Sequence, residues 1–144
     1  MISPKPYRLP SEKEWVYVAF ANGQGEKASD SVYLTSNCLG CEQGQNAPLV
    51  VGSLSQNEWG VYDITGNAWE WVGDEYSDDS GLPYYLNYDQ DYSDGYHTLR
   101  GGSFLTSIDH LGFEARRVVP VNVGMRTAGF RVALDEHVAP KLPS

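Results

Sequence analysis

The two cysteines of the chain form the motif with the clearest potential for chemistry. Cys38 and Cys41 are separated by two residues and are the only cysteines in the sequence. One C-x-x-C pair supplies only half of the ligands of a structural zinc site. A redox-active pair would need a strand before it and a helix after it, whereas residues 36–37 and 42–44 have the composition of a loop. The pair is therefore predicted to form a local disulfide or to remain as two free thiols.

Histidine and acidic residues offer other chemistry. The three histidines, His97, His110 and His137, lie far from the cysteines along the chain and form no H-x-x-x-H pattern. Acidic residues are concentrated in one stretch, which contains Asp74, Glu75, Asp78, Asp79, Asp89, Asp91 and Asp94. This stretch is predicted either to be a solvated loop surface or to attract cations such as calcium.

Composition and charge narrow the class of protein. The chain has 144 residues, 41% of them apolar and 20% charged, as expected for one globular domain with a single core. Its net charge of -9 argues against nucleic-acid binding, which needs a basic surface. No apolar run approaches the roughly 20 residues of a membrane span. Residues 1–6 show no apolar signal-peptide core, so the sequence indicates no particular compartment.

The elements that would position these residues are short. Ser11 and Glu14 form a capping box that predicts a helix with Trp15, Val18 and Ala19 on its buried side, ending at residues 22–23. Residues 22–48 read as a long loop, and 73–97 as a second irregular segment. Strands are predicted near 49–52, 59–64, 69–72, 98–104, 114–118 and 129–134. Pattern alone thus predicts a small α+β domain.

Four sequence blocks occur in order along the chain. They are Tyr7–Trp15 (YRLPSEKEW), Trp59–Trp71 (WGVYDITGNAWEW), Leu99–Phe104 (LRGGSF) and Gly129–Arg131 (GFR). Together they resemble the sulfatase-modifying-factor family, which includes formylglycine-generating enzymes, ergothioneine-type sulfoxide synthases and many non-catalytic relatives. The resemblance implies a variant of the C-type lectin fold, with short strands, one or two helices and long irregular loops.

The resemblance also implies domain limits. Residues 7–134 form the family-like domain, preceded by an N-terminal lead at 1–6 and followed by a polar tail at 135–144. The family's domain normally begins well before the first block, so this chain corresponds to its C-terminal half. A partner protein or a second copy of the chain is therefore expected to complete the sheet, because an exposed sheet edge favours pairing.

The cysteines that bind copper in formylglycine-generating enzymes have no equivalents here. In the family they follow the serine of R-G-G-S by three and eight residues, where this chain has Thr106 and Leu111. Copper(I) selects thiolate ligands, which neither residue provides. Iron-dependent relatives use a histidine triad that is partly outside this half. The chain is expected to be non-catalytic and to bind neither copper nor iron; the alternative is a divergent or split metal-dependent oxidoreductase.

A calcium site is the metal site that the resemblance retains. In the family the turn before W-E-W surrounds a calcium ion. The matching ligands are the side chains of Asp63 and Glu70 and the carbonyls of Gly66 and Ala68, all hard oxygen donors of the kind calcium prefers. Without the resemblance, Asp63 would be read as capping the turn and Glu70 as an exposed strand residue. A second family site would fall in the loop containing Asn37, where the ligands do not align.

The remaining expectations concern binding surfaces. Trp69 matches a residue that lines the family's substrate groove, and Ser103 matches a serine beside the family's copper. With Thr106, three residues after Ser103, they form the candidate groove. Arg100, Arg116 and Arg131 are predicted to pair with carboxylates or carbonyls under loops. Loops 73–97 and 104–127 are the expected contact surfaces for a protein or small ligand. Residues 104–128 also have the position that is diversified in variable proteins of diversity-generating retroelements. An accessory role in bacterial envelope machinery is a third possibility.

Overall fold

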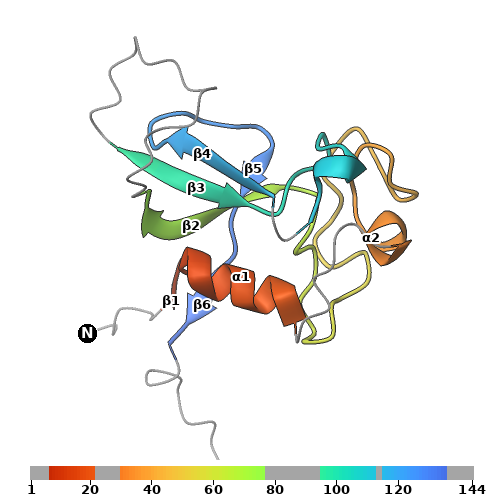
Figure 1. Ribbon diagram of the computed structural model, residues 1–144, viewed down its shortest axis with the longest axis horizontal. Helices are drawn as coiled ribbons and strands as arrows, with labels where there is room; N and C mark the ends of the chain where they lie inside the picture. Colours follow the sequence, from red (N-terminus) through yellow and green to blue (C-terminus); the bar gives the residue numbers. More distant parts are fainter. Residues whose placement is uncertain (1–6, 22–29, 77–94, 113–114, 136–144) are drawn as a thin grey trace, which may run out of the picture.

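A four-stranded sheet forms the centre of the molecule in the computed structural model, which describes residues 7–21, 30–76, 95–112 and 115–135 (Figure 1). The strand order is β4-β3-β2-β5. The strands are β2 (Trp69–Glu75), β3 (Tyr96–Arg100), β4 (Arg116–Pro120) and β5 (Ala128–Gly129). β2, β3 and β4 pair antiparallel, whereas β5 runs parallel to β2. Within the described ranges, no helix is long and apolar enough to cross a membrane.

The helix α1 (Glu12–Phe20) begins where the capping box predicts. The Ser11 hydroxyl accepts from the backbone N–H of Glu14 at 3.1 Å, and the Glu14 carboxylate accepts from the backbone N–H of Ser11 at 2.8 Å. Arg8 donates two hydrogen bonds to the same carboxylate. Hydrogen bonds from Arg8, followed by the one from the Ser11 backbone, lower the pKa of Glu14 to about 2. The start of the helix is thus fixed by neighbouring residues.

The side chains of β2 alternate between the two faces of the sheet and contribute to two separate core clusters. Val72 faces α1 and packs with Trp15 and Ile64. Trp69 faces the opposite side and packs with Leu99 and with the side chains of Ala115 and Val119. A strand with a period of two can serve both faces in this way. Glu70 shares the Val72 side of the strand, which brings a carboxylate into the interior.

A cluster of charged residues joins α1 to the sheet. Glu12 accepts hydrogen bonds from Arg100 at 2.9 Å and from Arg116 at 2.6 Å. Burial alone would raise the pKa of Glu12, but the two guanidinium groups outweigh it and hold the pKa below its usual value. The Arg100 guanidinium also lies 5.9 Å from the centre of the Trp15 ring. Both arginines therefore have the structural roles predicted for them.

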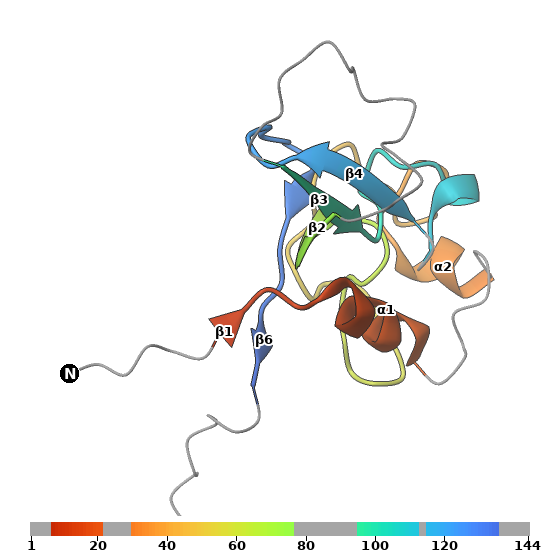
Figure 2. The same ribbon diagram turned by 60° about the vertical axis from the view of Figure 1, so that its left-hand side comes forward.

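A small second ribbon lies apart from the sheet. β1 (Tyr7–Arg8) pairs antiparallel with β6 (Ala133–Leu134), so the two ends of the described chain lie side by side (Figure 2). The sequence pattern missed β1, because two residues are too few to show a period. The predicted strand at 129–134 is divided in the structure into β5 and β6, with an extended connection between them.

Three other predicted elements differ from the structure. The predicted loop 22–48 contains a short helix, α2 (Asp30–Thr35). The sequence offers little indication of this helix, because the β-branched residues Val32 and Thr35 have low helix propensity. Residues 49–52 form a turn closed by the Ser53 N–H and the Val50 carbonyl, and residues 59–64 form turns and bends. Gly52 and Gly60 have φ of +72° and +78°, which excludes a regular strand at both places. The apolar residues at 49–52 and 59–64 therefore resemble a strand pattern in sequence but form no strand.

Candidate functional site

The turn from Asp63 to Glu70 carries the predicted calcium ligands and is held by backbone hydrogen bonds, three of which come from the N–H groups of residues 66–68. Gly66 N–H donates to the Gly101 carbonyl at 2.8 Å, and Asn67 N–H donates to the Asn37 carbonyl at 2.9 Å. Ala68 N–H donates to the Gly66 carbonyl at 2.8 Å. Asp63, Gly66 and Asn67 all have positive φ, which coils the backbone tightly. The turn is therefore built from residues that tolerate a left-handed conformation.

Glu70 is buried on β2 and accepts three short hydrogen bonds. Arg131 donates to its Oε2 and Oε1 atoms through Nε and Nη2, each at 2.6 Å. The indole N–H of Trp15 donates to Oε2 at 2.6 Å. Arg131 Nη2 also donates to the Tyr62 carbonyl at 3.0 Å. A buried carboxylate needs such partners, so Glu70 is not an exposed strand residue.

The donor set of this turn is compatible with calcium. Oε2 of Glu70 accepts two donors, whereas Oε1 accepts one and keeps a lone pair. Asp63 Oδ2 accepts from the Gly52 N–H at 2.7 Å, which leaves the second carboxylate oxygen for another partner. The Gly66 and Ala68 carbonyls are the other two hard oxygens among the predicted ligands, and the Gly66 carbonyl accepts from the Ala68 N–H. Among the described residues, no three His, Cys, Asp or Glu side chains form a metal-binding group, so carbonyls would have to contribute.

Asn37 and Asn67 connect this turn to the loop that precedes it. The Asn37 amide donates to the Asn67 Oδ1 atom at 3.1 Å and to the Ala47 carbonyl at 3.0 Å. Its own Oδ1 accepts from the Gln45 N–H at 2.7 Å. Asn67 Oδ1 also accepts from the Leu49 N–H. Both side chains are buried and hydrogen-bonded, so they fix an irregular segment that belongs to no described strand.

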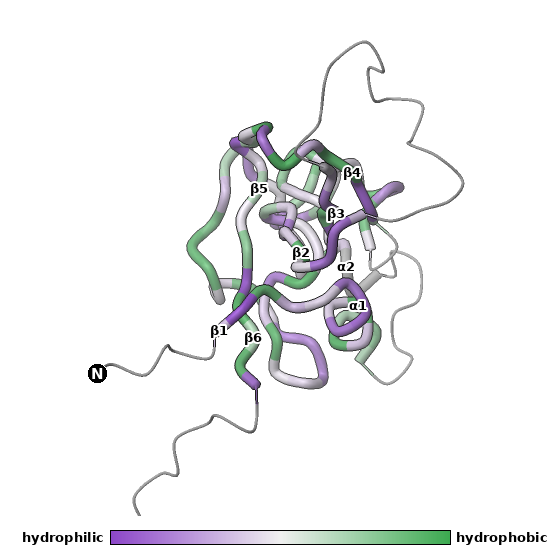
Figure 3. Tube along the Cα trace, turned by 90° about the vertical axis from the view of Figure 1, so that its left-hand side faces the viewer, coloured by the Kyte–Doolittle hydropathy of each residue, from purple (hydrophilic) through white to green (hydrophobic). Residues whose placement is uncertain are grey.

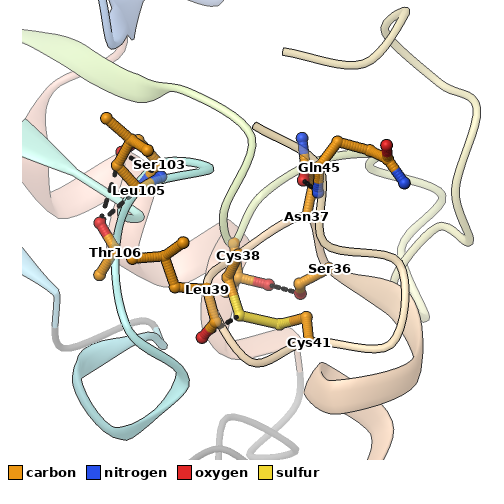
Figure 4. Close-up of a disulfide and its surroundings, with 10 residues drawn as sticks. Ser36, Asn37, Cys38, Leu39, Cys41, Gln45, Ser103, Leu105 and Thr106 are labelled. Atoms are coloured by element: carbon orange, nitrogen blue, oxygen red, sulfur yellow. Dashed lines mark hydrogen bonds between the residues drawn. A yellow bond between two sulfur atoms is a disulfide. The ribbon is translucent and has the colours of Figure 1, made fainter. Parts of the chain in front are cut away.

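Cys38 and Cys41 form a disulfide in the loop next to Asn37, with the sulfur of Cys38 buried (Figure 4). Leu39, the first of the two residues between them, pairs with the segment after the R-G-G-S block. Its N–H donates to the Thr106 carbonyl at 3.0 Å, and its carbonyl accepts from the Ile108 N–H at 2.9 Å. The C-x-x-C loop therefore acts as a structural support for residues 106–108. Of the two states predicted for the cysteines, the structure shows the disulfide.

Reduction of this disulfide is expected to destabilise the protein only moderately. The closed loop is short, and the loop-entropy relation gives about 2 kcal/mol for four residues. For a chain of this size, that corresponds to a fall in melting temperature of about 4–8 °C. Thermal unfolding with and without dithiothreitol measures the effect, with the Cys38→Ser/Cys41→Ser variant as the matched control. A fall in the control upon adding dithiothreitol would show that the reductant acts elsewhere.

The three residues of the predicted groove lie in two different environments. The indole of Trp69 is buried in the cluster with Leu99. Thr106 accepts from the Ser103 N–H through its Oγ1 atom at 2.9 Å, and the two hydroxyl oxygens are 3.5 Å apart (Figure 4). Ser103 is buried. Ser103 and Thr106 thus lie together in one turn, whereas Trp69 serves the core.

The predicted contact loops are described only in part. Residues 77–94 lie outside the described residues, and 73–76 and 95–97 belong to or flank β2 and β3. From 104–127 the structure describes all but 113–114, including a 3₁₀ turn at Ile108–His110. Leu105, Val121 and Val123 are exposed there. The second segment therefore presents apolar side chains that could contact a ligand.

Arg131 pairs with a carboxylate and a carbonyl as predicted, but sequence reasoning missed which residues are the partners of Arg131 and Asn37. The partner of Arg131 could not be identified, because Glu70 lies 61 positions away and many acidic residues compete. Asn37 was noted only as part of an unaligned loop, and its burial leaves no periodic signal. The G-F-R block is the one feature that pointed to Arg131.

Comparison with known proteins identifies relatives over nearly the whole chain. Residues 2–136 match the family described as Sulfatase-modifying factor enzyme 1-like domain. The inactive C-alpha-formylglycine-generating enzyme 2 of Bos taurus is 27% identical over an alignment of 114 residues, covering 71% of this chain and 34% of that protein.

Solved structures with the same fold are longer than this chain. Treponema denticola variable protein 1 matches with a TM-score of 0.67 and 25% identity, over 93% of this chain and 49% of its own. PvdO from Pseudomonas aeruginosa gives 0.69 and 28%, over 89% and 52%. CarF gives 0.62 and 23%, over 88% and 46%, and shows the fold alone. The chain thus spans about half the length of the structures it matches, and about a third of the inactive enzyme.

Proposed function

The chain belongs to the family of sulfatase-modifying factor enzyme 1-like domains, and on that premise we propose that it is a non-catalytic module that binds a protein or a small ligand through its loops. The supporting observation is the environment of Thr106 and Leu111, which stand where the resemblance places copper-binding cysteines. The Thr106 hydroxyl is occupied by the Ser103 N–H. Leu111 is buried, and a Cβ atom built on Gly102 would lie 2.6 Å from its Cδ1 atom.

Both positions therefore have a structural use that involves no metal. Threonine and leucine offer no thiolate, the ligand that copper(I) selects. The similarity to a relative named as an inactive enzyme also supports the proposal. Elemental analysis of the purified protein, after incubation with copper(I) or iron(II) and removal of free metal, tests it. We expect less than stoichiometric retention of either metal; one tightly bound ion per chain with oxygen consumption would contradict the proposal.

Calcium is the cofactor proposed for this scaffold. Asp63, Glu70 and the carbonyls of Gly66 and Ala68 would hold it, and the ion would neutralise charge within the turn. Calcium at one hundred times its dissociation constant would stabilise the fold by about 2.7 kcal/mol, so EGTA is expected to lower the melting temperature by about 5–11 °C. Asp63→Gly is the matched control, because glycine keeps the φ of 55° while removing the carboxylate. A melting temperature that EGTA leaves unchanged would contradict the calcium proposal.

A special case of the binding module is a variable protein of a diversity-generating retroelement. The structural match to Treponema denticola variable protein 1 over 93% of this chain favours it. Residues 104–128 would then be the diversified segment, and Leu105, Val121 and Val123 are exposed within it. Sequencing the locus tests the idea: a near-identical template repeat beside a reverse transcriptase gene is expected, and a locus without them would contradict it.

A further inference from the structure

The loop that contains the C-x-x-C disulfide lies at one end of the molecule, apart from the sheet. In Figure 1, α2 and the 3₁₀ turn at Ile108–His110 lie on the right, and β1 and β6 lie at the lower left. Figure 3 views the molecule from that left-hand side, so the sheet and α1 lie in front of α2. Cys38, Phe104 and Leu111 are buried, yet none of them belongs to either core cluster of the described residues. A change in this region can therefore leave the sheet intact.

The disulfide ring holds the loop against the segment 106–108. The Leu39 N–H donates to the Thr106 carbonyl at 3.0 Å, and the Leu39 carbonyl accepts from the Ile108 N–H at 2.9 Å. A Cβ atom built on Gly40 would lie 3.3 Å from the Cγ2 atom of Ile108, so the loop backbone packs closely on that side chain. Leu39 and Gly40 both lie within the ring that the disulfide closes, and Leu39 lies between the disulfide and Thr106 (Figure 4).

The base of the loop does not depend on the disulfide. The Asn37 Oδ1 atom accepts from the Gln45 N–H at 2.7 Å, which closes a wider loop, 37–45, around the disulfide ring. Asn37 is fully buried, and its amide also donates to the Asn67 Oδ1 atom at 3.1 Å. Opening the ring therefore frees residues 38–41, while the wider loop stays attached to the turn that carries the predicted calcium ligands.

The two cysteines differ in access to solvent. Cys38 is 1% exposed, whereas Cys41 is partly exposed. An attacking thiolate needs access to only one sulfur atom of a disulfide. The ring is short, so opening it removes little of the stability of the fold, and the reduced chain stays folded. The disulfide therefore combines an accessible sulfur atom with a local structural effect.

We infer that the Cys38–Cys41 disulfide is a redox switch that controls the order of the segment 106–108. The inference rests on the proposed function, because this segment belongs to the proposed contact loop 104–127. The trigger is a dithiol reductant. Its thiolate attacks the Cys41 sulfur, the Sγ–Sγ bond breaks, and Cys38 leaves as a thiolate that takes up a proton. The second thiol of the reductant then displaces Cys41 as a thiol, so the chain gains two electrons and two protons and the reductant becomes a disulfide.

Reduction changes the hydrogen bonds of Leu39. The Cys38 sulfur lies 3.6 Å from the Leu39 carbonyl oxygen. A disulfide sulfur has no proton to donate, whereas the thiol of the reduced chain has one. The carbonyl that anchors the Ile108 N–H thus gains a second donor when the ring around it opens. Leu105 adjoins the segment and is 39% exposed, so a ligand that contacts it binds the oxidised chain more tightly than the reduced chain.

Amide hydrogen exchange measured by NMR tests the inference without a ligand. In dithiothreitol, exchange at the Leu39 and Ile108 amides is expected to become about 20-fold faster, the equilibrium factor that corresponds to the entropy of the short ring. The Trp69 and Gly73 amides are the controls, because they bond to carbonyls outside the loop and should keep their rates. Oxidised glutathione should restore the original rates. Unchanged rates at Leu39 and Ile108, or an equal acceleration at all four amides, would overturn the inference.

Cys41→Ser is the matched variant, because it removes only the partly exposed sulfur and leaves Cys38 as a thiol, as in the reduced chain. Without a reductant it should show the fast exchange at Leu39 and Ile108, and dithiothreitol should change nothing further. Slow exchange in this variant would contradict the switch. Maleimide labelling after acid quenching and denaturation counts the thiols. Two per chain are expected after native treatment with dithiothreitol, and none would overturn the inference. A tightly bound copper or iron ion with oxygen consumption would overturn the non-catalytic proposal and leave the exchange result standing.

Discussion

Replacing Arg131 by methionine is expected to lower the free energy of unfolding by about 3 kcal/mol, at the lower end of the cost of breaking a buried ion pair. Arg131 supplies two of the three hydrogen bonds of the buried Glu70 carboxylate. Its removal would leave that charge with only the Trp15 indole N–H. We place the cost at the lower end because the Arg131 side chain is 26% exposed, which lets water reach the carboxylate. Denaturant unfolding of the two proteins measures the difference.

Arg116→Met is the matched control for this prediction. Arg116 donates to Glu12 at the same 2.6 Å, but it is more exposed, and Glu12 keeps its contact with Arg100. A loss below about 1 kcal/mol is expected, as for other exposed pairs. The double variant Glu70→Met/Arg131→Met should regain part of the stability lost by Arg131→Met, since the unpaired charge is then removed. Equal losses at Arg131 and Arg116 would show that burial of Glu70 is not the cause.

The features predicted correctly from sequence are those set by neighbouring residues. The capping box needs only Ser11 and Glu14, three positions apart, and α1 begins there. β2 was identifiable because Trp69, Glu70, Trp71 and Val72 alternate locally. The family itself was identifiable from four blocks, since their order and spacing carry information that no single block has. Local chemistry therefore sufficed for the elements and for the fold class.

The features that sequence could not provide depend on partners far along the chain. Asn37 and Asn67 are 30 positions apart, and nothing in either neighbourhood shows that their side chains meet. The turns at 49–52 and 59–64 contain apolar residues in strand-like order, yet left-handed glycines divide them. The exposure of Phe130 and Val132 was also invisible, because their alternation is that of an ordinary half-buried strand. Each case depends on which residues, distant in the sequence, lie next to one another in the folded chain.

Gly66→Ala is expected to have an even larger effect than the loss of Arg131, and it would test how the turn that carries the predicted calcium ligands is built. A Cβ atom at Gly66 would lie 2.6 Å from the Asn37 carbonyl oxygen and 3.2 Å from its carbon. These are backbone atoms, and the Asn37 carbonyl already accepts from the Asn67 N–H. The left-handed φ of +76° adds its own cost. We expect a loss of about 3–5 kcal/mol, as strain and overpacking add.

Gly60→Ala separates the two causes in this prediction. Gly60 has nearly the same φ, +78°, but a Cβ atom there would meet only the flexible end of Gln56 at 3.7 Å. Its loss should be limited to the conformational cost, about 1–2 kcal/mol. Denaturant unfolding of both variants therefore isolates the collision with Asn37. If the two substitutions cost the same, the contact between the turn and Asn37 is loose enough to yield. The buried Asn37–Asn67 pair would then not be what holds the turn from Asp63 to Glu70 in place.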